Sequence, residues 1–248
     1  MPRYFLEVAY VGTNYSGFQI QQNAVTIQQK IEEALTIFFK QTIPLTGSSR
    51  TDAGVHAKQN FFHFDFRENI NSKVLYNINS ILPNDIAVKN IFNVPPEAHC
   101  RFNAISRTYN YYIYKNKNPF LNNRAWYYPY PINIQLLNEA ATTILTYNNF
   151  EAFSKQNTQV NNFICNIQQS FWQQESETLM YHIQANRFLR GMVKAMVATQ
   201  LKVGRGIISM QQFSSILEAR DNTKAFFSVP SKGLFLERVG FDVNYFGK

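Results

Sequence analysis

The segment from Ser48 to His56, with the sequence Ser-Ser-Arg-Thr-Asp-Ala-Gly-Val-His, holds the residue types best suited to chemistry. In extended backbone, residues two apart face the same side, so we expect Arg50 and Asp52 to lie side by side. A nearby guanidinium favours the ionised form of a carboxylate. An ionised carboxylate is an effective nucleophile at a sugar anomeric carbon. Asp52 is therefore the candidate nucleophile, and an ion pair that only braces the loop is the alternative.

Three cations further along the chain form a second candidate site. Arg187, Arg190 and Lys194 recur at spacings of three and four residues, and a helix beginning at Arg187 would place them in one stripe. Such a stripe is suited to RNA phosphates, although an ordinary solvated helix face has the same pattern. The net charge of +8, from 24 Lys and Arg against 16 Asp and Glu, also favours a polyanionic partner.

The histidines and cysteines lack the spacings that metal sites and disulfide frameworks show. The histidines stand apart in the sequence: His56, His63, His99 and His182. The two cysteines, Cys100 and Cys165, have no paired spacing. We therefore predict no metal and no cofactor, and a reduced, cytoplasmic setting. With neither a signal core nor a spanning segment in the sequence, we also expect no membrane association.

The elements that must position these residues follow the order strand-helix-strand-strand-helix-strand, which can be traced twice. Alternating apolar residues and aromatic runs predict strands such as Thr108 to Lys115 and Leu234 to Val243. Helix starts are indicated by capping residues, with Thr26 and Gln29 spaced as in a capping box. A helical pattern also runs from Arg187 to the glycines at 204 and 206.

This order predicts an α/β (α+β) fold made of two ferredoxin-like β-α-β-β-α-β halves, whose antiparallel sheets flank a basic cleft. The N-terminal half, residues 1–104, carries the Asp52 loop. The C-terminal half, residues 105–248, carries a tyrosine-rich strand and the basic helix.

Sequence blocks in a fixed order extend this pattern along nearly the whole chain. The blocks are Tyr15-Ser16-Gly17-Phe18-Gln19, Arg50-Thr51-Asp52-Ala53-Gly54-Val55-His56, Leu82-Pro83-Asn84-Asp85-Ile86, His99-Cys100-Arg101-Phe102-Asn103-Ala104, Arg107-Thr108-Tyr109-Asn110-Tyr111, Asn186-Arg187-Phe188-Leu189-Arg190-Gly191 and Gly233-Leu234-Phe235-Leu236. Their types and order resemble the TruA family of tRNA pseudouridine synthases. A set of ordered blocks is much more specific than any single motif.

The resemblance implies a cofactor-independent isomerase that converts uridines of the tRNA anticodon stem-loop, at positions 38 to 40, to pseudouridine. Asp52 matches the family's catalytic aspartate, and Arg50 matches an arginine that helps to expel the base from its helix. Tyr109 matches a tyrosine that stacks on the target base, although its strand face, shared with Tyr111, also suits core packing. The family acts as a homodimer, so the resemblance implies the same for this chain.

The resemblance also implies that Arg187, Arg190 and Lys194 bind RNA and that one such cation pairs with Asp52. The family usually has arginine where this chain has Lys194. A lysine keeps the positive charge but cannot make the bidentate hydrogen bonds that a guanidinium makes to a carboxylate. Whether the aspartate attacks C6 of the base or C1′ of the sugar stays open.

Two other classes of function were weighed. A non-catalytic RNA-binding protein of the same fold would also use tyrosine-rich strands and a basic face, but it would gain little from a carboxylate beside phosphates. A glycoside hydrolase needs two carboxylates across a sugar, and the nearest second candidate in the sequence is Asp65.

Overall fold

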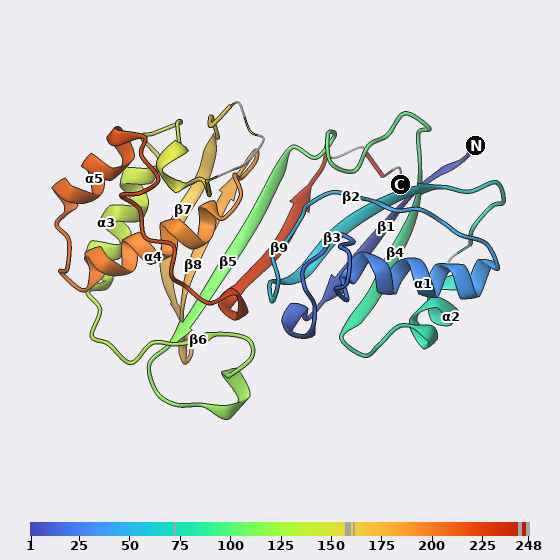
Figure 1. Ribbon diagram of the computed structural model, residues 1–248, viewed down its shortest axis with the longest axis horizontal. Helices are drawn as coiled ribbons and strands as arrows, with labels where there is room; N and C mark the ends of the chain where they lie inside the picture. The colour runs from blue at the N-terminus through green and yellow to red at the C-terminus, as the bar shows by residue number, and fades with distance from the viewer. Residues whose placement is uncertain (72, 157–159, 161, 243–244, 247–248) are drawn as a thin grey trace. The chain divides into compact units, whose positions relative to one another are not determined.

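The computed structural model describes residues 1–71, 73–156, 160, 162–242 and 245–246, and it has a mixed α+β fold (Figure 1). The predicted fold class is thereby confirmed. The ferredoxin-like topology of the two halves and the basic cleft stay predictions. Within the described ranges, no helix combines the length and the apolar character that crossing a membrane requires.

The chain divides into two compact units, and the division is not the same as the predicted one. Unit 1 comprises Met1–Ile105 and Phe235–Lys248, and unit 2 comprises Ser106–Leu234. The predicted halves, 1–104 and 105–248, placed the last strand in the second half. That strand instead pairs in parallel with a strand of unit 1, and local sequence patterns do not reveal such a long-range pairing.

Unit 1 is a sheet with two helices, in the predicted order β-α-β-β-α-β. Its elements are β1 (Arg3–Tyr10), the 3-10 turn η1 (Gly12–Asn14), α1 (Ile27–Phe39), β2 (Thr46–Gly47), β3 (His56–Asp65), α2 (Val74–Ile81), β4 (Ile86–Val94) and, from the end of the chain, β9 (Leu234–Gly240). Strand β1 pairs antiparallel with both β3 and β4. Strands β2 and β9 pair with different stretches of β3, antiparallel and parallel respectively.

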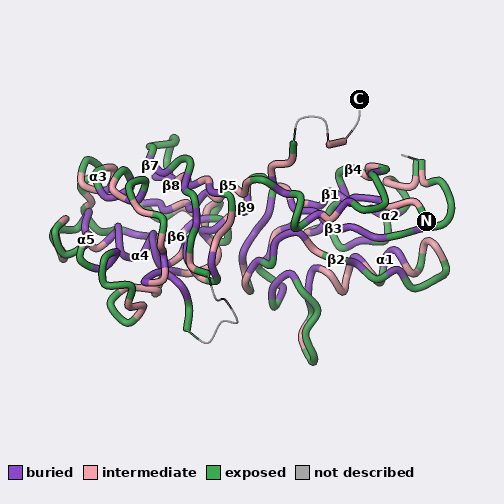
Figure 2. The backbone as a smooth tube through the Cα atoms, turned by 90° about the horizontal axis from the view of Figure 1, so that it is seen from above, coloured by how far each residue is buried: buried purple, intermediate pink, exposed green. Residues whose placement is uncertain are grey.

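Aromatic side chains fill both faces of the sheet of unit 1. Phe62, expected to share a face with Phe64 and Phe66, stacks on Phe18 with ring centres 4.4 Å apart. On the other face, Phe61 packs against Phe241 and Phe246 of the C-terminal segment. Strands β1 and β3 are therefore buried along most of their length (Figure 2), which gives the end of β3 a rigid base.

Within its described residues, unit 2 holds three helices and further strands of the same sheet. Its elements are β5 (Ser106–Tyr114), η2 (Pro119–Leu121), β6 (Trp126–Tyr127), α3 (Ile134–Ile144), η3 (Glu151–Phe153), β7 (Ile167–Glu175), β8 (Thr178–Ala185), α4 (Met192–Gly204), α5 (Met210–Ala219) and η4 (Ser231–Gly233). Strand β8 pairs antiparallel with both β5 and β7. Helix α3 lies against β7 and α4, and nearly every residue of α4 is buried.

Several predicted caps and boundaries agree with the structure. The Gln29 N–H donates to Oγ1 of Thr26 at 3.3 Å, which is one half of the predicted capping box. The Gln29 side-chain amide donates instead to Glu33, at 2.9 Å. The last strand ends at Gly240, before the predicted end at Val243, which lies outside the described residues. Helix α4 ends at Gly204, as predicted.

The predicted helix start at Arg187 is wrong. Helix α4 begins at Met192, and Arg187 and Arg190 lie in the non-helical segment before it. The cause is Gly191, the residue that precedes the helix, whose φ of +75° is left-handed and interrupts the right-handed helical path. The three cations therefore do not form a helical stripe, because only Lys194 is on α4.

Candidate active site

Asp52 lies in the loop that joins β2 to β3, at the first position of a tight turn. The Val55 N–H donates to the Asp52 carbonyl oxygen at 3.2 Å, which closes a four-residue turn. The third residue of this turn, Gly54, has a φ of +75°, a conformation that disfavours residues with a side chain. Along the sequence, Arg50 is exposed, Thr51 is buried and Asp52 is half-exposed. The Asp52 carboxylate is therefore accessible, while the backbone that carries it is constrained by the turn.

A network of hydrogen bonds among buried polar groups fixes the Asp52 loop to β1 and β3. Nδ2 of Asn60, a fully buried residue of β3, donates to the Ser49 carbonyl oxygen at 2.9 Å and to the hydroxyl oxygen of Tyr10 at 3.2 Å. The Tyr10 hydroxyl in turn lies 2.8 Å from Oγ1 of Thr51. Because the tyrosine oxygen accepts from Asn60, its own proton is available to Thr51. The network thus fixes the two residues that flank Arg50, and Thr51 directly precedes Asp52.

A second loop, residues 12–18, packs on the Asp52 loop through backbone contacts. The Phe18 N–H donates to the Thr51 carbonyl oxygen at 3.1 Å, and the Gly54 N–H donates to the Tyr15 carbonyl oxygen at 3.3 Å. Gly17 has a φ of +104°, and a Cβ there would lie 3.1 Å from the Thr51 oxygen. Only a glycine lets the two backbones approach this closely without strain.

His56 supports the start of β3 and does not face the solvent. It is 1% exposed, its Nδ1 accepts the Gly12 N–H at 3.0 Å, and its ring packs on Phe235 with centres 4.5 Å apart. An acceptor at Nδ1 places the proton of the neutral ring on Nε2. His56 therefore braces the loop by hydrogen bonding.

The sequence interpretation missed Asp85 as a support for the same region. Its carboxylate accepts hydrogen bonds from the Tyr15 hydroxyl and from Nδ2 of Asn14, the latter at 3.1 Å. Its carbonyl oxygen also accepts the Val11 N–H at 2.9 Å. Burial and the Asp85 carboxylate both raise the pKa of Tyr15. The only signal in the sequence was that Asp85 belongs to the block Leu82-Pro83-Asn84-Asp85-Ile86, which assigned it no role.

In unit 2, Tyr109 lies at the edge of a buried row of side chains. Tyr111 and Ile113, on the same face of β5, are buried in the core. Tyr109 is half-buried, and its ring meets Phe188 edge-on with centres 5.2 Å apart. The core packing of this strand face therefore ends at Tyr109, whose ring is partly accessible.

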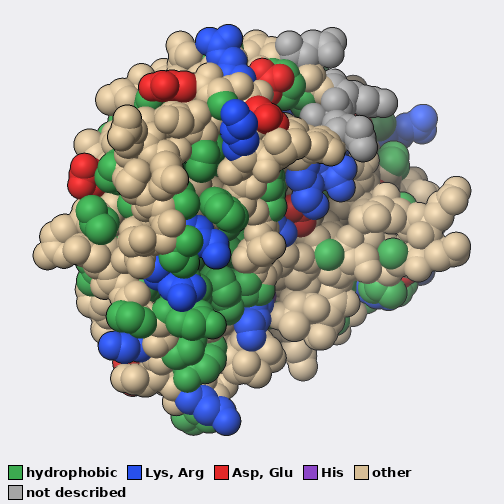
Figure 3. All heavy atoms as spheres, turned by 60° about the vertical axis from the view of Figure 1, so that its left-hand side comes forward, with side chains coloured by type: hydrophobic (Ala, Val, Ile, Leu, Met, Phe, Trp, Pro, Cys, Tyr) green, Lys and Arg blue, Asp and Glu red, His purple; other side chains and the backbone are tan. Residues whose placement is uncertain are grey.

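The predicted cations of unit 2 occupy different environments. Arg187 is half-buried and Arg190 is exposed, both between β8 and α4. Lys194, in the first turn of α4, donates through Nζ to the Ser231 hydroxyl at 3.3 Å. On the face shown in Figure 3, Lys and Arg side chains occur in several separate places, not in one continuous patch.

Asp65, the possible second carboxylate of a glycoside hydrolase, is committed to an ion pair. Nε and Nη2 of Arg3 donate to its two carboxylate oxygens at 2.7 and 2.8 Å. These hydrogen bonds hold the pKa of Asp65 below its usual range. Asp65 is also the last residue of β3, whereas Asp52 precedes the first. A two-carboxylate hydrolase site has no support in this arrangement.

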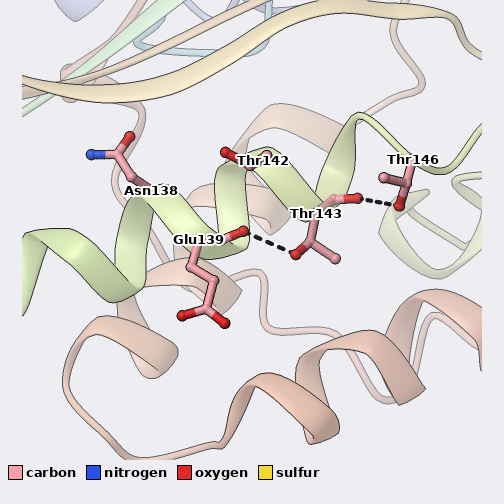
Figure 4. Close-up of a pocket in the computed structure, with 5 residues that line it drawn as sticks. All are labelled: Asn138, Glu139, Thr142, Thr143 and Thr146. Carbon is pink, nitrogen blue, oxygen red and sulfur yellow. Dashed lines mark hydrogen bonds between the residues drawn. The ribbon is translucent and has the colours of Figure 1, made fainter.

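A hollow on the surface of α3 is chemically unsuited to catalysis. It is lined by Asn138, Glu139, Thr142, Thr143 and Thr146. The Thr143 and Thr146 hydroxyls donate to carbonyl oxygens of their own helix region, those of Glu139 and Thr143 respectively (Figure 4). Two of its three threonine hydroxyls are bonded to the backbone, and its single carboxylate, that of Glu139, has no partner among the lining residues, so we assign the hollow no role.

Comparisons with known proteins bring these observations together. Residues 7–103 and 140–242 match a family model described as tRNA pseudouridine synthase. The chain is 44% identical to the tRNA pseudouridine synthase A of Parabacteroides distasonis, across 99% of this chain and 98% of that one. It is 44% identical to the Bacteroides fragilis protein of the same name, with 98% of each chain covered. For the Staphylococcus aureus protein, identity is 35%, with 98% and 93% covered.

The chain therefore belongs to the tRNA pseudouridine synthase family. It is an isomerase, and its reaction converts uridine in tRNA to pseudouridine. The resemblance to this family, based on ordered sequence blocks, is confirmed.

The buried network generates a prediction about Asn60. Replacing it, Asn60→Leu, leaves the Tyr10 hydroxyl and the Ser49 carbonyl without their donor, at a cost of about 1–3 kcal/mol in folding stability. We expect kcat to fall by more than about 10-fold with tRNA affinity little changed, because the loop loses its position while Arg187, Arg190 and Lys194, which are in unit 2, keep theirs. Single-turnover kinetics and filter binding measure the two quantities.

The matched control is Asn79→Leu. Asn79 also makes two side-chain hydrogen bonds, both to the backbone of Val88 at 2.8 Å, within unit 1 but away from the Asp52 loop. It should lower stability and leave kcat near the wild-type value. Equal kcat values for the two folded variants would show that Asn60 has no positioning role.

Proposed function

We propose that this chain isomerises uridines at positions 38 to 40 of the tRNA anticodon stem-loop, with the Asp52 carboxylate as nucleophile. Family membership supplies the reaction. The assignment of the nucleophile is supported by one observation above others. Asp52 is a half-exposed carboxylate on a loop that buried hydrogen bonds fix on both sides. A solvated loop without a chemical task would not need such support.

The proposed chemistry begins with attack by a carboxylate oxygen of Asp52 on C6 of the base or C1′ of the sugar. The bond between N1 and C1′ breaks, the base turns, and C5 forms the new bond to C1′. If Asp52 is bonded to C1′, C5 displaces the carboxylate as the new bond forms. If Asp52 is bonded to C6, the carboxylate leaves after the new bond has formed. The proton on C5 is lost while N1 gains one. The reaction is an isomerisation, so atoms and electrons balance without a cofactor.

Arg50 and Tyr109 are proposed to receive the target base. A base within a helical stem must leave its stack, at a cost of a few kcal/mol. The exposed guanidinium of Arg50, two residues from the nucleophile, can donate hydrogen bonds in a plane and stack in the place that the base vacates. The half-buried ring of Tyr109 offers a face on which the extruded base can stack.

The first test replaces the nucleophile. Asp52→Asn removes the charge at nearly constant volume, so pseudouridine formation should fall by about 10³-fold or more while tRNA affinity stays within a few fold. Mapping pseudouridine in tRNA incubated with the purified protein gives both rate and position. Asp221→Asn makes the same change at an exposed carboxylate of unit 2 that bonds to Thr223, and it should retain full activity. Turnover by Asp52→Asn would remove this residue from the mechanism.

A second test concerns the cations of unit 2. We propose that Arg187, Arg190 and Lys194 bind tRNA phosphates, even though they do not form one helical stripe. Neutralising all three should weaken binding and lower the slope of log affinity against log salt by about 2 to 3, since fewer counterions are released. Binding titrations over a range of salt concentrations measure the slope.

Two lysines of unit 1 provide the comparison for this test. Lys30 and Lys89 already pair with Glu33 and Glu7, at 2.7 and 3.7 Å. The double variant Lys30→Gln with Lys89→Gln should change the salt slope by well under one per charge removed. If the triple variant shows the same small change, the three cations do not contact phosphates.

We further propose that the protein acts in the cytoplasm as a homodimer, an inference that rests on family membership. Sedimentation equilibrium at catalytic concentrations should give twice the chain mass of 28.8 kDa. A monomeric mass under conditions of full activity would contradict the dimer.

A further inference from the structure

Three metal-ligating side chains meet in unit 1, at a place that the proposed chemistry does not use. They are His63 on β3 and the adjacent residues His99 and Cys100, from the segment that follows β4. One candidate ligand atom from each lies within 4.8 Å of the other two. Two of the four histidines that stand apart in the sequence are therefore brought together by the fold. His63 and His99 are 36 positions apart in the sequence, which concealed this cluster.

The separations are close to those of a tetrahedral zinc site. Nδ1 of His63 lies 3.2 Å from Sγ of Cys100, and the His63 and His99 rings meet with centres 4.5 Å apart. With Zn–N of about 2.0 Å and Zn–S of about 2.3 Å, tetrahedral ligand atoms lie roughly 3.3–3.6 Å apart. The candidate ligand atoms lie at most 4.8 Å apart, so an atom at this distance has to move about 1 Å closer to the others to reach tetrahedral spacing. Rotation of the half-exposed His99 ring can provide this movement.

The charges around the cluster are partly balanced. Arg3 and Arg101 are cations near the two histidines, and they would oppose a bound ion. The Asp65 carboxylate pairs with Arg3 through two hydrogen bonds, which offsets one of these charges.

Binding a metal would rearrange hydrogen bonds of the cluster, among them the one between Nδ1 of His63 and Sγ of Cys100. The Cys100 thiol donates to the Thr46 carbonyl oxygen at 3.2 Å, and it would lose this proton on becoming a thiolate. The Cys100 N–H reaches Nδ1 of His63 at a long 3.4 Å, and the Arg101 N–H donates to Nδ1 of His99 at 3.1 Å. A thiolate bond to zinc outweighs contacts of this kind, although the rearrangement makes the site weaker than one already formed.

We propose that His63, His99 and Cys100 bind a zinc ion, with the fourth coordination position open on the side of the half-exposed His99. Two imidazoles and one thiolate are a ligand set that zinc favours over magnesium or calcium. The ion would be structural for this chain, because its ligands lie at the Asp65 end of β3 and the Asp52 loop lies at the other. It would tie the segment after β4 to β3.

Cobalt(II), used as the metal alone, tests the proposal on the full-length protein without an affinity tag. A cobalt–thiolate charge-transfer band and tetrahedral visible bands should appear and saturate at one equivalent per chain, with one proton released as the thiol ionises. Zinc should displace the cobalt and abolish both sets of bands. Absence of the charge-transfer band from the wild-type protein would overturn the proposal.

Variants identify the ligands. Cys100→Ala should lose the charge-transfer band, and His99→Gln, at a half-exposed position that tolerates substitution, should weaken cobalt binding by more than about 10-fold. Cys165→Ala is the matched control, because Cys165 is also buried and burial raises the pKa of its thiol to about 11. It should leave the spectrum unchanged. A band that survives in Cys100→Ala would also overturn the proposal.

Thermal unfolding provides a second readout that does not depend on cobalt. Excess zinc should raise Tm by several degrees relative to a chelator in the wild-type protein and in Cys165→Ala, since the ion binds the folded state. The shift should vanish in Cys100→Ala and His99→Gln. An equal zinc effect in all four proteins would place the ion elsewhere.

Discussion

The hydrogen bonds from one buried amide group are the constraint on which the proposed active site depends. Nδ2 of Asn60 serves both the Ser49 carbonyl and the Tyr10 hydroxyl, and Tyr10 reaches Thr51. A buried donor or acceptor without a partner costs about 1–3 kcal/mol, so the loop has one arrangement that satisfies all of these groups. The carboxylate of Asp52 is thereby held in place by interactions that it does not itself make.

The sheet of unit 1 makes that constraint rigid. Tyr10 ends β1 and Asn60 lies within β3, two antiparallel neighbours whose faces are both packed with aromatic side chains. Movement of either strand would disturb the packing on both faces, and interiors of this density resist small displacements. The loop of residues 12–18, held by Asp85, closes over the Asp52 loop through backbone contacts. Buried side chains of β1 and β3 thus hold in place the loop that carries the accessible carboxylate of Asp52.

Local patterns in the sequence predicted most of the elements, because alternation and capping are short-range signals. The capping residue Thr26 accepts the expected N–H of Gln29. The predictions that failed depended on contacts between residues far apart in the chain or on the backbone conformation of a single residue. The pairing of β9 with β3 joins residues far apart in the chain, and the left-handed backbone of Gly191 moved the start of α4 from Arg187 to Met192.

The same contrast applies to the candidate sites. The Asp52 loop stood out because its residue types are unusual and adjacent, whereas the supports Asn60 and Asp85 have no distinctive local pattern. The cluster of His63, His99 and Cys100 is formed by the fold alone. Residue type and spacing indicate where chemistry takes place. The residues that hold the reactive side chains in position are identified only from the pairing of the strands in the structure.

The most direct test of the central claim is rapid chemical quenching of the reaction with tRNA, followed by digestion and mass spectrometry of the peptides. A nucleophilic Asp52 predicts a uridine-nucleotide adduct on the peptide that contains this residue, appearing and decaying within one turnover. An adduct on a different side chain during normal turnover would contradict the account.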